Sequence, residues 1–380
     1  MDKEGAIALI NELSDLFVGR EEEAKVSVLA LVTKQHCVFI GEPGTAKSAL
    51  LGTLAEAVNG NYFKYLLTKY TIPSELVGEF DPVTFQKAGK LQRDVNGMLP
   101  TANIAFVDEI YKANSETLNA LLNITNERVF MDTGNRKIPV PLYSMFAASN
   151  ELPQSDDLQA FHDRLFFKHF VKPMNKDRIE EAIVKTVNNP HPAIRTKYTL
   201  KDIDELNQKI WDYLRQNVND VARNVATVVK LLKKEGVTIS DRTAVGARFF
   251  PFVTAAYSYI FDQPDFKKAA ISVSKYILHD FEDQKDAYER ALDTMIPPEL
   301  RAAQEALDKA HEARKAGDFK TAKEEALSAV QKLKEIVGKD SDKEKFDMFR
   351  SEIKEVGERA TRLVNAINKA TSELESEITA

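Results

Sequence analysis

The segment Gly41-Glu-Pro-Gly-Thr-Ala-Lys-Ser48 carries the strongest chemical signal in the sequence. It follows a short apolar run and precedes a helical pattern, and its glycines and lysine predict a loop that holds phosphate groups. Such a loop surrounds phosphates with backbone N–H groups and a helix N-terminus. Lys47 would reach the β- and γ-phosphates, and the Ser48 hydroxyl would bind Mg²⁺. The alternative is a glycine-rich turn that binds nothing.

One position of this loop departs from the usual pattern. Ala46 stands where a glycine normally precedes the lysine. If Ala46 lies in the first turn of the following helix, alanine is a favourable residue there. We therefore expect the substitution to be tolerated.

Two carboxylates form the second signal, because Asp108-Glu109 directly follows the apolar run 103–107. A buried strand that ends in two acids places them at the carboxyl edge of a sheet, where ligands of α/β proteins bind. Asp108 would hold Mg²⁺, and Glu109 would orient and polarise an attacking water. The alternative is a solvated turn, which the phosphate loop upstream makes less favourable.

The first part of the chain, residues 1–171, alternates helix-like and strand-like patterns. This alternation predicts an α/β fold with a mostly parallel sheet that is covered on both faces. The expected helices are 6–17, 21–33, 49–58 and 118–124, and the expected strands are 37–40, 62–67, 103–107 and 142–148.

Two insertions interrupt the alternation. Residues 83–99 contain Ala88-Gly89 and Asn96-Gly97, and residues 128–140 contain Thr133-Gly134-Asn135 between two β-prone arms. Both patterns predict hairpins, and neither is needed to close a sheet. We expect both to project from the core.

The remaining chain is predicted to be helical. Residues 172–298 would form a small helical domain, with helices at about 200–218, 221–234 and 241–261. The last segment is residues 299–380. Residues 301–380 contain 16 basic and 17 acidic side chains, and apolar residues recur at a 3-4 spacing over 319–336 and 346–374. This seam predicts a charged helical hairpin or three-helix bundle.

Composition excludes several classes of protein. With 52 basic and 58 acidic residues the net charge is −6, so bulk charge does not favour coating of nucleic acid. Cys37 is the only cysteine, which excludes an internal disulfide framework and suits a reducing cytosol. The start of the sequence lacks a signal-peptide pattern, and the apolar stretch 249–261 is too short to span a bilayer. We expect a cytoplasmic protein.

Read together, the segments resemble the MoxR branch of the AAA+ ATPases, and within it the RavA subfamily. The resemblance covers roughly residues 10–260. Besides the two nucleotide motifs, it rests on Tyr65-Leu-Leu-Thr-Lys-Tyr-Thr-Ile-Pro-Ser-Glu75, Val107-Asp-Glu-Ile-Tyr-Lys-Ala113, Leu118–Phe130 and Ala147-Ala-Ser-Asn-Glu-Leu-Pro153. It implies an AAA+ αβα sandwich followed by a helical lid.

The resemblance also implies roles for residues at matching positions. Asn150 would be sensor 1 and position the water, or else a turn residue. Arg164 would be an arginine finger that reaches a neighbouring subunit's ATP, or else pair with Asp163. Arg242 would be sensor 2 and contact phosphates from within the same chain. Arg248 is the alternative for sensor 2, and Arg128 is a second finger candidate that could instead pair locally.

The resemblance further implies which residues bind the nucleotide. The phosphate-loop contacts would come from Gly41, Glu42, Pro43, Gly44, Thr45, Ala46, Lys47, Ser48 and Ala49. Val18, in Phe17-Val-Gly-Arg20, stands where AAA+ proteins usually enclose the adenine. A Val-Gly turn between helices is the alternative there.

The function implied is Mg²⁺-dependent hydrolysis of ATP in a ring, most simply a homohexamer. The energy would be used to remodel or mature partner proteins, often with a protein that carries a von Willebrand A domain. A nucleic-acid-stimulated motor is the alternative, supported by Lys87, Lys90, Arg93, Arg136 and Lys137 on the two insertions. A non-hydrolysing scaffold is a third, less favoured hypothesis, because every position expected of an ATPase is present.

Overall fold

The computed structural model describes residues 1–89, 91–132, 136–188, 193–295, 298–315, 318–337 and 350–379. The chain divides into two compact units, Met1–Lys285 (unit 1) and Asp286–Ala380 (unit 2). Helix α14 (Phe281–Met295) crosses the division. The boundary therefore falls before the predicted start of the charged tail at residue 299.

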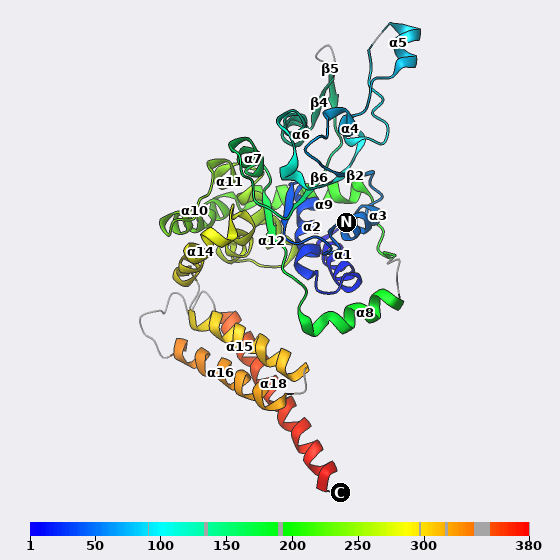
Figure 1. The fold of residues 1–380 in the computed structure, drawn as a ribbon. Helices are drawn as coiled ribbons and strands as arrows, with labels where there is room; N and C mark the ends of the chain where they lie inside the picture. Colours follow the sequence, from blue (N-terminus) through cyan, green and yellow to red (C-terminus); the bar gives the residue numbers. More distant parts are fainter. Residues whose placement is uncertain are drawn as a thin grey trace. The chain divides into compact units, whose positions relative to one another are not determined.

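Unit 1 contains a central parallel sheet with strand order β2-β3-β6-β1-β7 (Figure 1). The sequence predicted four of these strands and missed β7, which pairs with β1 in parallel. The strands are β1 (Cys37–Ile40), β2 (Tyr62–Leu66), β3 (Ile104–Asp108), β6 (Ser144–Ser149) and β7 (Phe167–Phe170).

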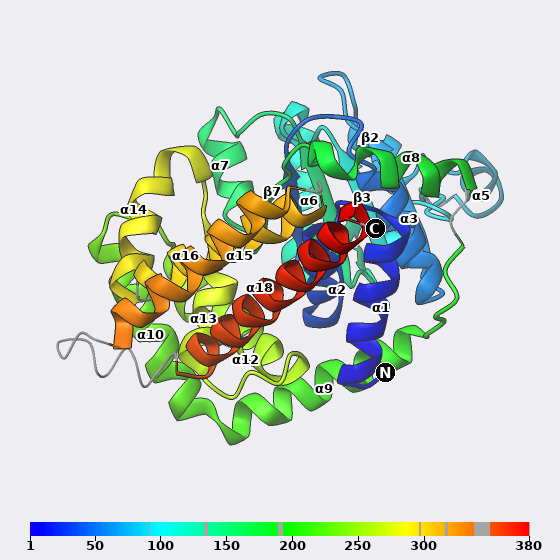
Figure 2. The same cartoon turned by 90° about the horizontal axis from the view of Figure 1, so that it is seen from below.

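Both faces of the sheet are buried, as the near-continuous apolar strands predicted. One face contributes Val38, Val107 and Ala147 to an apolar core shared with α6 and the segment around Phe161. Alternate residues such as Phe39 point to the other face, where the helices before and after β1 cover the sheet. Helices α1, α2 and α3 lie side by side there (Figure 1, Figure 2).

Among the described helices of unit 1, α1, α2, α3, α6, α9 and α10 agree with predicted helices to within a few residues, whereas α4, α5, α7, α8 and α13 were not predicted. The described helices are α1 (Lys3–Leu16), α2 (Glu21–Thr33), α3 (Lys47–Ala57), α4 (Pro73–Val77), α5 (Pro82–Ala88), α6 (Ser115–Glu127), α7 (Asp156–His162), α8 (Ile179–Asn188), α9 (Leu200–Gln216), α10 (Val218–Lys234), α11 (Asp241–Val245), α12 (Phe250–Ile260) and α13 (Phe266–Ser274). Short 3₁₀ turns lie at Leu99–Thr101, Ile110–Lys112, Lys176–Arg178 and Lys275–Ile277.

The predicted single helix 241–261 was wrong, because the chain breaks between α11 and α12. Gly246 closes α11, and Pro251 lies in the first turn of α12, where its missing N–H costs no hydrogen bond. Two helices therefore replace one.

The two insertions have different structures. The strands β4 (Val129–Asp132) and β5 (Arg136–Pro139) pair antiparallel, which confirms the second predicted hairpin. The first insertion is not a hairpin, because its leading part forms α5. Asp81 caps this helix through the N–H of Val83, and Gly89 ends it at φ 61°. Among the described residues of this region, the bridge between Phe80 and Arg93 is the one feature that resembles strand pairing.

Unit 2 contains three described helices after the end of α14. They are α15 (Pro298–Lys315), α16 (Phe319–Val337) and α18 (Arg350–Thr379), and each packs against the other two. The predicted 3-4 seam is buried at Ala322, Ala326, Ala329 and Leu333 and at Ile353, Val356, Ala360, Leu363 and Ile367. Phe346 and Phe349, at the start of the predicted seam 346–374, lie outside the described residues. Among the described helices, none has both the length and the apolar character needed to span a bilayer.

Candidate functional site

Three predicted site segments meet at one edge of the sheet. The phosphate loop follows β1, Asp108 ends β3, and Asn150 follows β6. These strands are neighbours in the order β3-β6-β1, and all run parallel, so their carboxyl ends lie together. The N–H of Gly41 donates to the Ser149 carbonyl at 2.9 Å, which ties the loop to the end of β6.

Two positions of the phosphate loop favour glycine because of their backbone conformation or the space around them. Gly41 has φ 147°, and a Cβ there would lie 2.7 Å from the carbonyl oxygen of Val171. Gly44 has φ 80°, and a Cβ there would meet nothing within 4 Å, so the loop is open above it. The first turn of α3 has no side-chain cap. A helix N-terminus in this condition is suited to an anion.

Ala46 lies outside the first turn, contrary to the explanation offered from the sequence. It is the N-cap of α3 and has left-handed backbone angles, φ 60° and ψ 12°. An L-residue in this region carries a steric cost of about 1–2 kcal/mol, which glycine avoids. This backbone conformation explains why glycine is usual at this position, and it means that the backbone of Ala46 is strained.

The Lys47 ammonium is folded over the loop. Its Nζ donates to the carbonyl oxygens of Glu42 at 3.0 Å and Gly41 at 3.4 Å, and to Thr45 Oγ1 at 3.0 Å. Burial lowers the pKa of Lys47, and the nearby Asp108 carboxylate opposes that shift. The lysine and the first acid of the Asp108-Glu109 pair thus share one electrostatic environment, as the sequence predicted.

Ser48 has a neighbour that sequence reasoning missed. Lys64 Nζ, from the edge strand β2, donates to Ser48 Oγ at 3.2 Å. The Tyr62 hydroxyl on the same strand donates to the Ser48 carbonyl at 3.4 Å. A period-two strand pattern places Tyr62 and Lys64 on one face, but only the fold shows that this face meets α3.

The two acids differ in their contacts. Asp108 Oδ1 accepts the N–H of Glu109 at 3.0 Å. Glu109 has φ 56°, a left-handed backbone conformation that costs roughly 1–3 kcal/mol for a residue of this type. Its Oε2 lies 3.3 Å from Lys112 Nζ, and its side chain is 21% exposed. Asp108 and Ser48 carry oxygen atoms of the kind that Mg²⁺ prefers, and the Glu109 side chain is partly open to solvent. Asn150 is exposed just beyond β6.

Arg164 and Arg242 lie close together. Arg164 follows α7 and donates to the Ala160 carbonyl, and burial lowers its pKa with the charge of Arg242 acting in the same direction. Asp163 pairs with Arg242 Nη1 at 3.2 Å and with His279 Nε2 at 3.3 Å. Burial would raise the pKa of Asp163, but His279 and the other partners outweigh it and hold that pKa well below its usual range.

Arg164 precedes the amino end of β7, whereas the phosphate loop follows the carboxyl end of the neighbouring parallel strand β1, so the arginine pair lies away from the chain's own phosphate loop. Figure 1 shows α7 and α11 on one side of unit 1 and α3 on the other. The expectation that Arg242 contacts phosphates in the same chain does not match this placement, because its ion pair is with Asp163 beside Arg164. The structure groups the finger candidate with the sensor-2 candidate.

Arg128 is a structural residue in this fold. Its guanidinium lies against His36 Nε2 and donates to the carbonyls of Thr125 (2.7 Å), Lys34 (2.9 Å) and Tyr143 (3.2 Å). Burial lowers the pKa of Arg128 to about 10, and the nearby charge of Arg248 adds to this.

Residues 34–36 precede β1, and residue 143 precedes β6. Arg128 and its neighbour Arg248 therefore lie at the amino edge of the sheet, opposite the phosphate loop. This placement does not favour Arg248 as a ligand of phosphates in the same chain, and the hydrogen bonds of Arg128 support its local-pairing alternative.

A cavity of about 1,010 Å³ adjoins the phosphate loop. Val18, predicted beside the adenine, is buried, whereas its neighbour Phe17 lines this cavity together with Ala46 and Ala49. The remaining lining comes from α1, α8 and the segment that leads to α9: Ala8, Asn11, Glu12, Asp15, Leu16, Lys185, Thr186, Ala193, Arg195 and Thr196. The cavity is large enough for a nucleotide base and sugar. The sequence predicted a helix at α1 but not that α1 lines this cavity, and it did not predict α8.

Comparison with known protein families decides the assignment. The family model of the MoxR domain in MoxR–vWA–β-propeller ternary systems matches residues 6–208, more than half of the chain. The chain belongs to the MoxR family. This match includes the phosphate loop, Asp108-Glu109, Asn150 and Arg164.

Curated relatives agree with the family over the same region. Two uncharacterized proteins of Methanocaldococcus jannaschii are 36% and 35% identical over 231 residues, which is 61% of this chain and 60% and 59% of theirs. The chaperone MoxR1 of Mycobacterium tuberculosis is 26% identical over 188 residues, 48% of each chain. The chain thus spans about 60% of the length of the first two relatives.

A solved structure has a similar fold. It is the crystal structure of a candidate ATPase from Cytophaga hutchinsonii, with a TM-score of 0.59 and 18% sequence identity. The aligned region covers 77% of this chain and 94% of the Cytophaga chain. At this level of identity the likeness establishes the fold.

Proposed function

We propose that this MoxR-family protein hydrolyses ATP with Mg²⁺ and uses the energy to remodel partner proteins. One observation carries the proposal: the phosphate loop, Asp108-Glu109 and Asn150 follow three neighbouring parallel strands and so meet at one edge. ATP and Mg²⁺ are the ligands that this set of groups suits.

The residues have distinct roles in the proposed reaction. The loop N–H groups, the N-terminus of α3 and Lys47 would hold the phosphates. Ser48 and Asp108 would hold Mg²⁺, which when bound neutralises charge on the phosphate oxygens. Glu109 would accept a proton from the attacking water, and Asn150 would orient that water.

The arginine pair supports a site shared between subunits. Arg164 and Arg242 lie on the side of unit 1 away from α3, so they would serve the phosphates bound by a neighbouring copy. A planar guanidinium can neutralise charge on two phosphoryl oxygens at once. A ring is the closed arrangement in which every copy both gives and receives this contact, and a homohexamer is our proposal.

The finer assignments rest on resemblance. The motif pattern supports the RavA subfamily, and the description of the matched family supports a partner with a von Willebrand A domain. We place the protein in the cytoplasm. The first insertion and the segment before it would contact the protein substrate, since they expose large apolar side chains: Leu66, Tyr70, Ile72, Phe80, Val83, Phe85 and Leu91.

The nucleic-acid motor is less favoured because cations that supported it are used within the chain. Arg93 stacks on the Phe80 ring at 4.0 Å, donates to the Gly78 carbonyl at 2.7 Å and pairs with Asp132 at 3.7 Å. Arg136 also lies 4.0 Å from Asp132. Lys90 lies outside the described residues.

The test separates binding from turnover. Lys47→Ala should abolish binding of a fluorescent ATP analogue, whereas Glu109→Gln should retain binding and lose hydrolysis by about 100-fold or more. Lys230→Ala and Glu116→Gln are matched controls, because both side chains are exposed on helices away from the loop. Hydrolysis that survives Glu109→Gln, or ATP binding that survives Lys47→Ala, would contradict the proposal. Stimulation of hydrolysis by DNA would instead favour the motor.

A further inference from the structure

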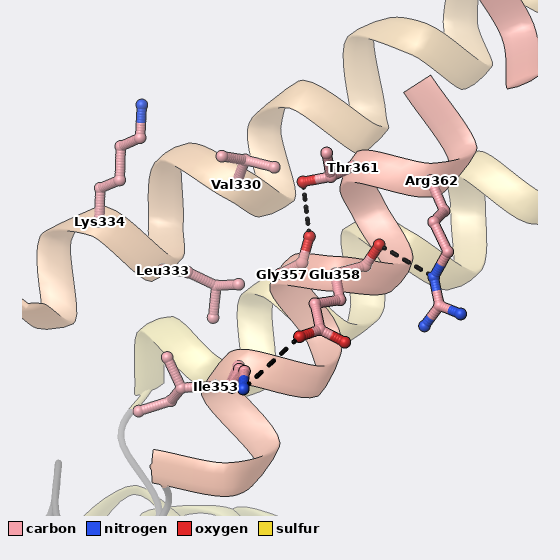
Figure 3. A pocket seen from close by; sticks show the side chains of 9 residues that line it. Val330, Leu333, Lys334, Ile353, Gly357, Glu358, Thr361 and Arg362 are labelled. Atoms are coloured by element: carbon pink, nitrogen blue, oxygen red, sulfur yellow. Dashed lines mark hydrogen bonds and ion pairs between the residues drawn. The ribbon is translucent and has the colours of Figure 1, made fainter. Parts of the chain in front are cut away.

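Unit 2 has a groove between α16 and α18 that the proposed function does not use. Figure 3 shows it, and its volume is about 620 Å³. Val330, Leu333 and Ile353 form an apolar floor between the two helices. Leu333 and Ile353 are buried and belong to the bundle seam, so the floor is continuous with the bundle core.

The rim of this groove is cationic. Lys334 from α16 and Lys354 and Arg362 from α18 line it. Among the described residues that line the groove, Glu358 is the one acid, and it lies 3.8 Å from Lys354. Residues 301–380 as a whole have 16 basic and 17 acidic side chains, so the groove concentrates positive charge within a nearly neutral segment.

The positive charge continues around α18. A second hollow of about 390 Å³ lies between α15 and α18, with Leu363 and Ala366 at its base. It is lined by His311, Arg314, Arg359 and Arg362. Arg362 therefore belongs to both hollows and links them into one cationic face.

A glycine keeps the α16–α18 groove open. Gly357 lies inside α18, where glycine costs about 1 kcal/mol relative to alanine. A Cβ at this position would lie 3.5 Å from Leu333 Cδ1, an ordinary contact, and its φ is not in the left-handed region. Neither packing nor backbone conformation requires glycine here. The missing side chain instead leaves space directly above the apolar floor.

We infer that the α16–α18 groove binds an acidic amphipathic helix of a partner protein. The apolar floor would accept side chains at i, i+3 or i+4 and i+7 of such a helix. Its carboxylates would lie against Lys334, Lys354 and Arg362, with further acids reaching Arg359. An acidic helix fits this charge pattern, whereas a neutral apolar helix would gain no electrostatic attraction from the cations at the rim.

The test uses the full chain and a labelled synthetic helix of about five turns with leucines at 3-4 spacing and flanking glutamates. Fluorescence anisotropy should show saturable binding that weakens as salt rises. The same peptide with glutamines in place of glutamates should bind about 10-fold more weakly. Equal binding of both peptides, or no binding of the acidic one, would overturn the inference.

Variants then locate the site. The double variant Lys354→Gln and Arg362→Gln should weaken binding by about 3- to 10-fold. Gly357→Leu should remove most of it, because its side chain would occupy the space above the floor. Lys320→Gln with Lys323→Gln is the matched control, since both lysines are exposed on α16 and neither lines the groove.

Circular dichroism would verify the helix content of every variant. An unchanged affinity in the folded double variant would contradict the inference. A second result would also contradict it: Gly357→Leu changes the oligomeric mass of the protein but leaves peptide binding unchanged. The groove would then hold a second copy of the chain and not the peptide.

Discussion

The left-handed backbone at Ala46 predicts the sign of a stability change. Replacing Ala46 with glycine removes a steric cost of about 1–2 kcal/mol for an L-residue at φ 60°. Glycine also gives the unfolded chain more freedom, which costs about 0.5–1 kcal/mol. We therefore expect Ala46→Gly to raise the free energy of unfolding of unit 1 by about 0.5–1 kcal/mol.

Trp211 makes this measurement specific to unit 1. It is the only tryptophan in the sequence, and it stacks on Phe252 with ring centroids 4.2 Å apart. Its fluorescence in urea denaturation, without nucleotide, reports the unfolding of this unit. Ala222→Gly is the matched control, because Ala222 is exposed within α10, where glycine should lower stability by about 1 kcal/mol.

Both variants replace alanine with glycine, but they should change the free energy of unfolding in opposite directions. If Ala46→Gly destabilises unit 1 as much as Ala222→Gly does, the loop does not hold Ala46 in the left-handed region. The account of the phosphate loop as a strained segment would then be refuted.

Three further predictions concern stability and the insertions. Arg128→Ala should cost roughly 3 kcal/mol of unfolding free energy, because buried carbonyls lose their donor, yet ATP binding should persist since Arg128 lies at the opposite edge of the sheet. Urea denaturation and nucleotide titration would check both parts. Burial would raise the pKa of Glu22, but Lys275 and its hydrogen bonds outweigh this and lower that pKa to about 2. Glu22 should therefore stabilise unit 1 above about pH 4.5 and lose that effect as pH falls toward 2, a dependence that Glu22→Gln should weaken in thermal melts. Gly78→Ala should disrupt the first insertion, because its Cβ would lie 1.9 Å from the Asp94 carbonyl oxygen. Limited proteolysis should then cut the insertion faster, while ATP binding is retained.

The sequence predicted what depends on local pattern. The phosphate loop, the Asp108-Glu109 pair and Asn150 each follow an apolar strand, and parallel strands bring such segments together. The first insertion shows where local signals compete: Asp81 and Pro82 favour a helix start, whereas Ala88-Gly89 resembles a turn. In the structure that glycine ends a helix.

Contacts between distant segments could not be predicted in the same way. Arg128 is half-buried because residues 34–36 and Tyr143 surround it, and these lie far from it in the sequence. The position of Arg242 depends on how α11 packs near α7, which no short pattern encodes. Lys64 next to Ser48 likewise depends on the contact between β2 and α3.

The shared site is the central claim, and mixing two variants tests it most directly. Glu109→Gln and Arg164→Ala should each be nearly inactive alone. In a 1:1 mixed ring, a site formed by Glu109 of one copy and Arg164 of the next is intact in about one case in four, so hydrolysis should recover to about a quarter of wild type. Arg223→Ala, an arginine 75% exposed on α10, should be active without mixing. Failure of the mixture to recover activity, with ATP binding and ring-sized mass retained, would contradict the account.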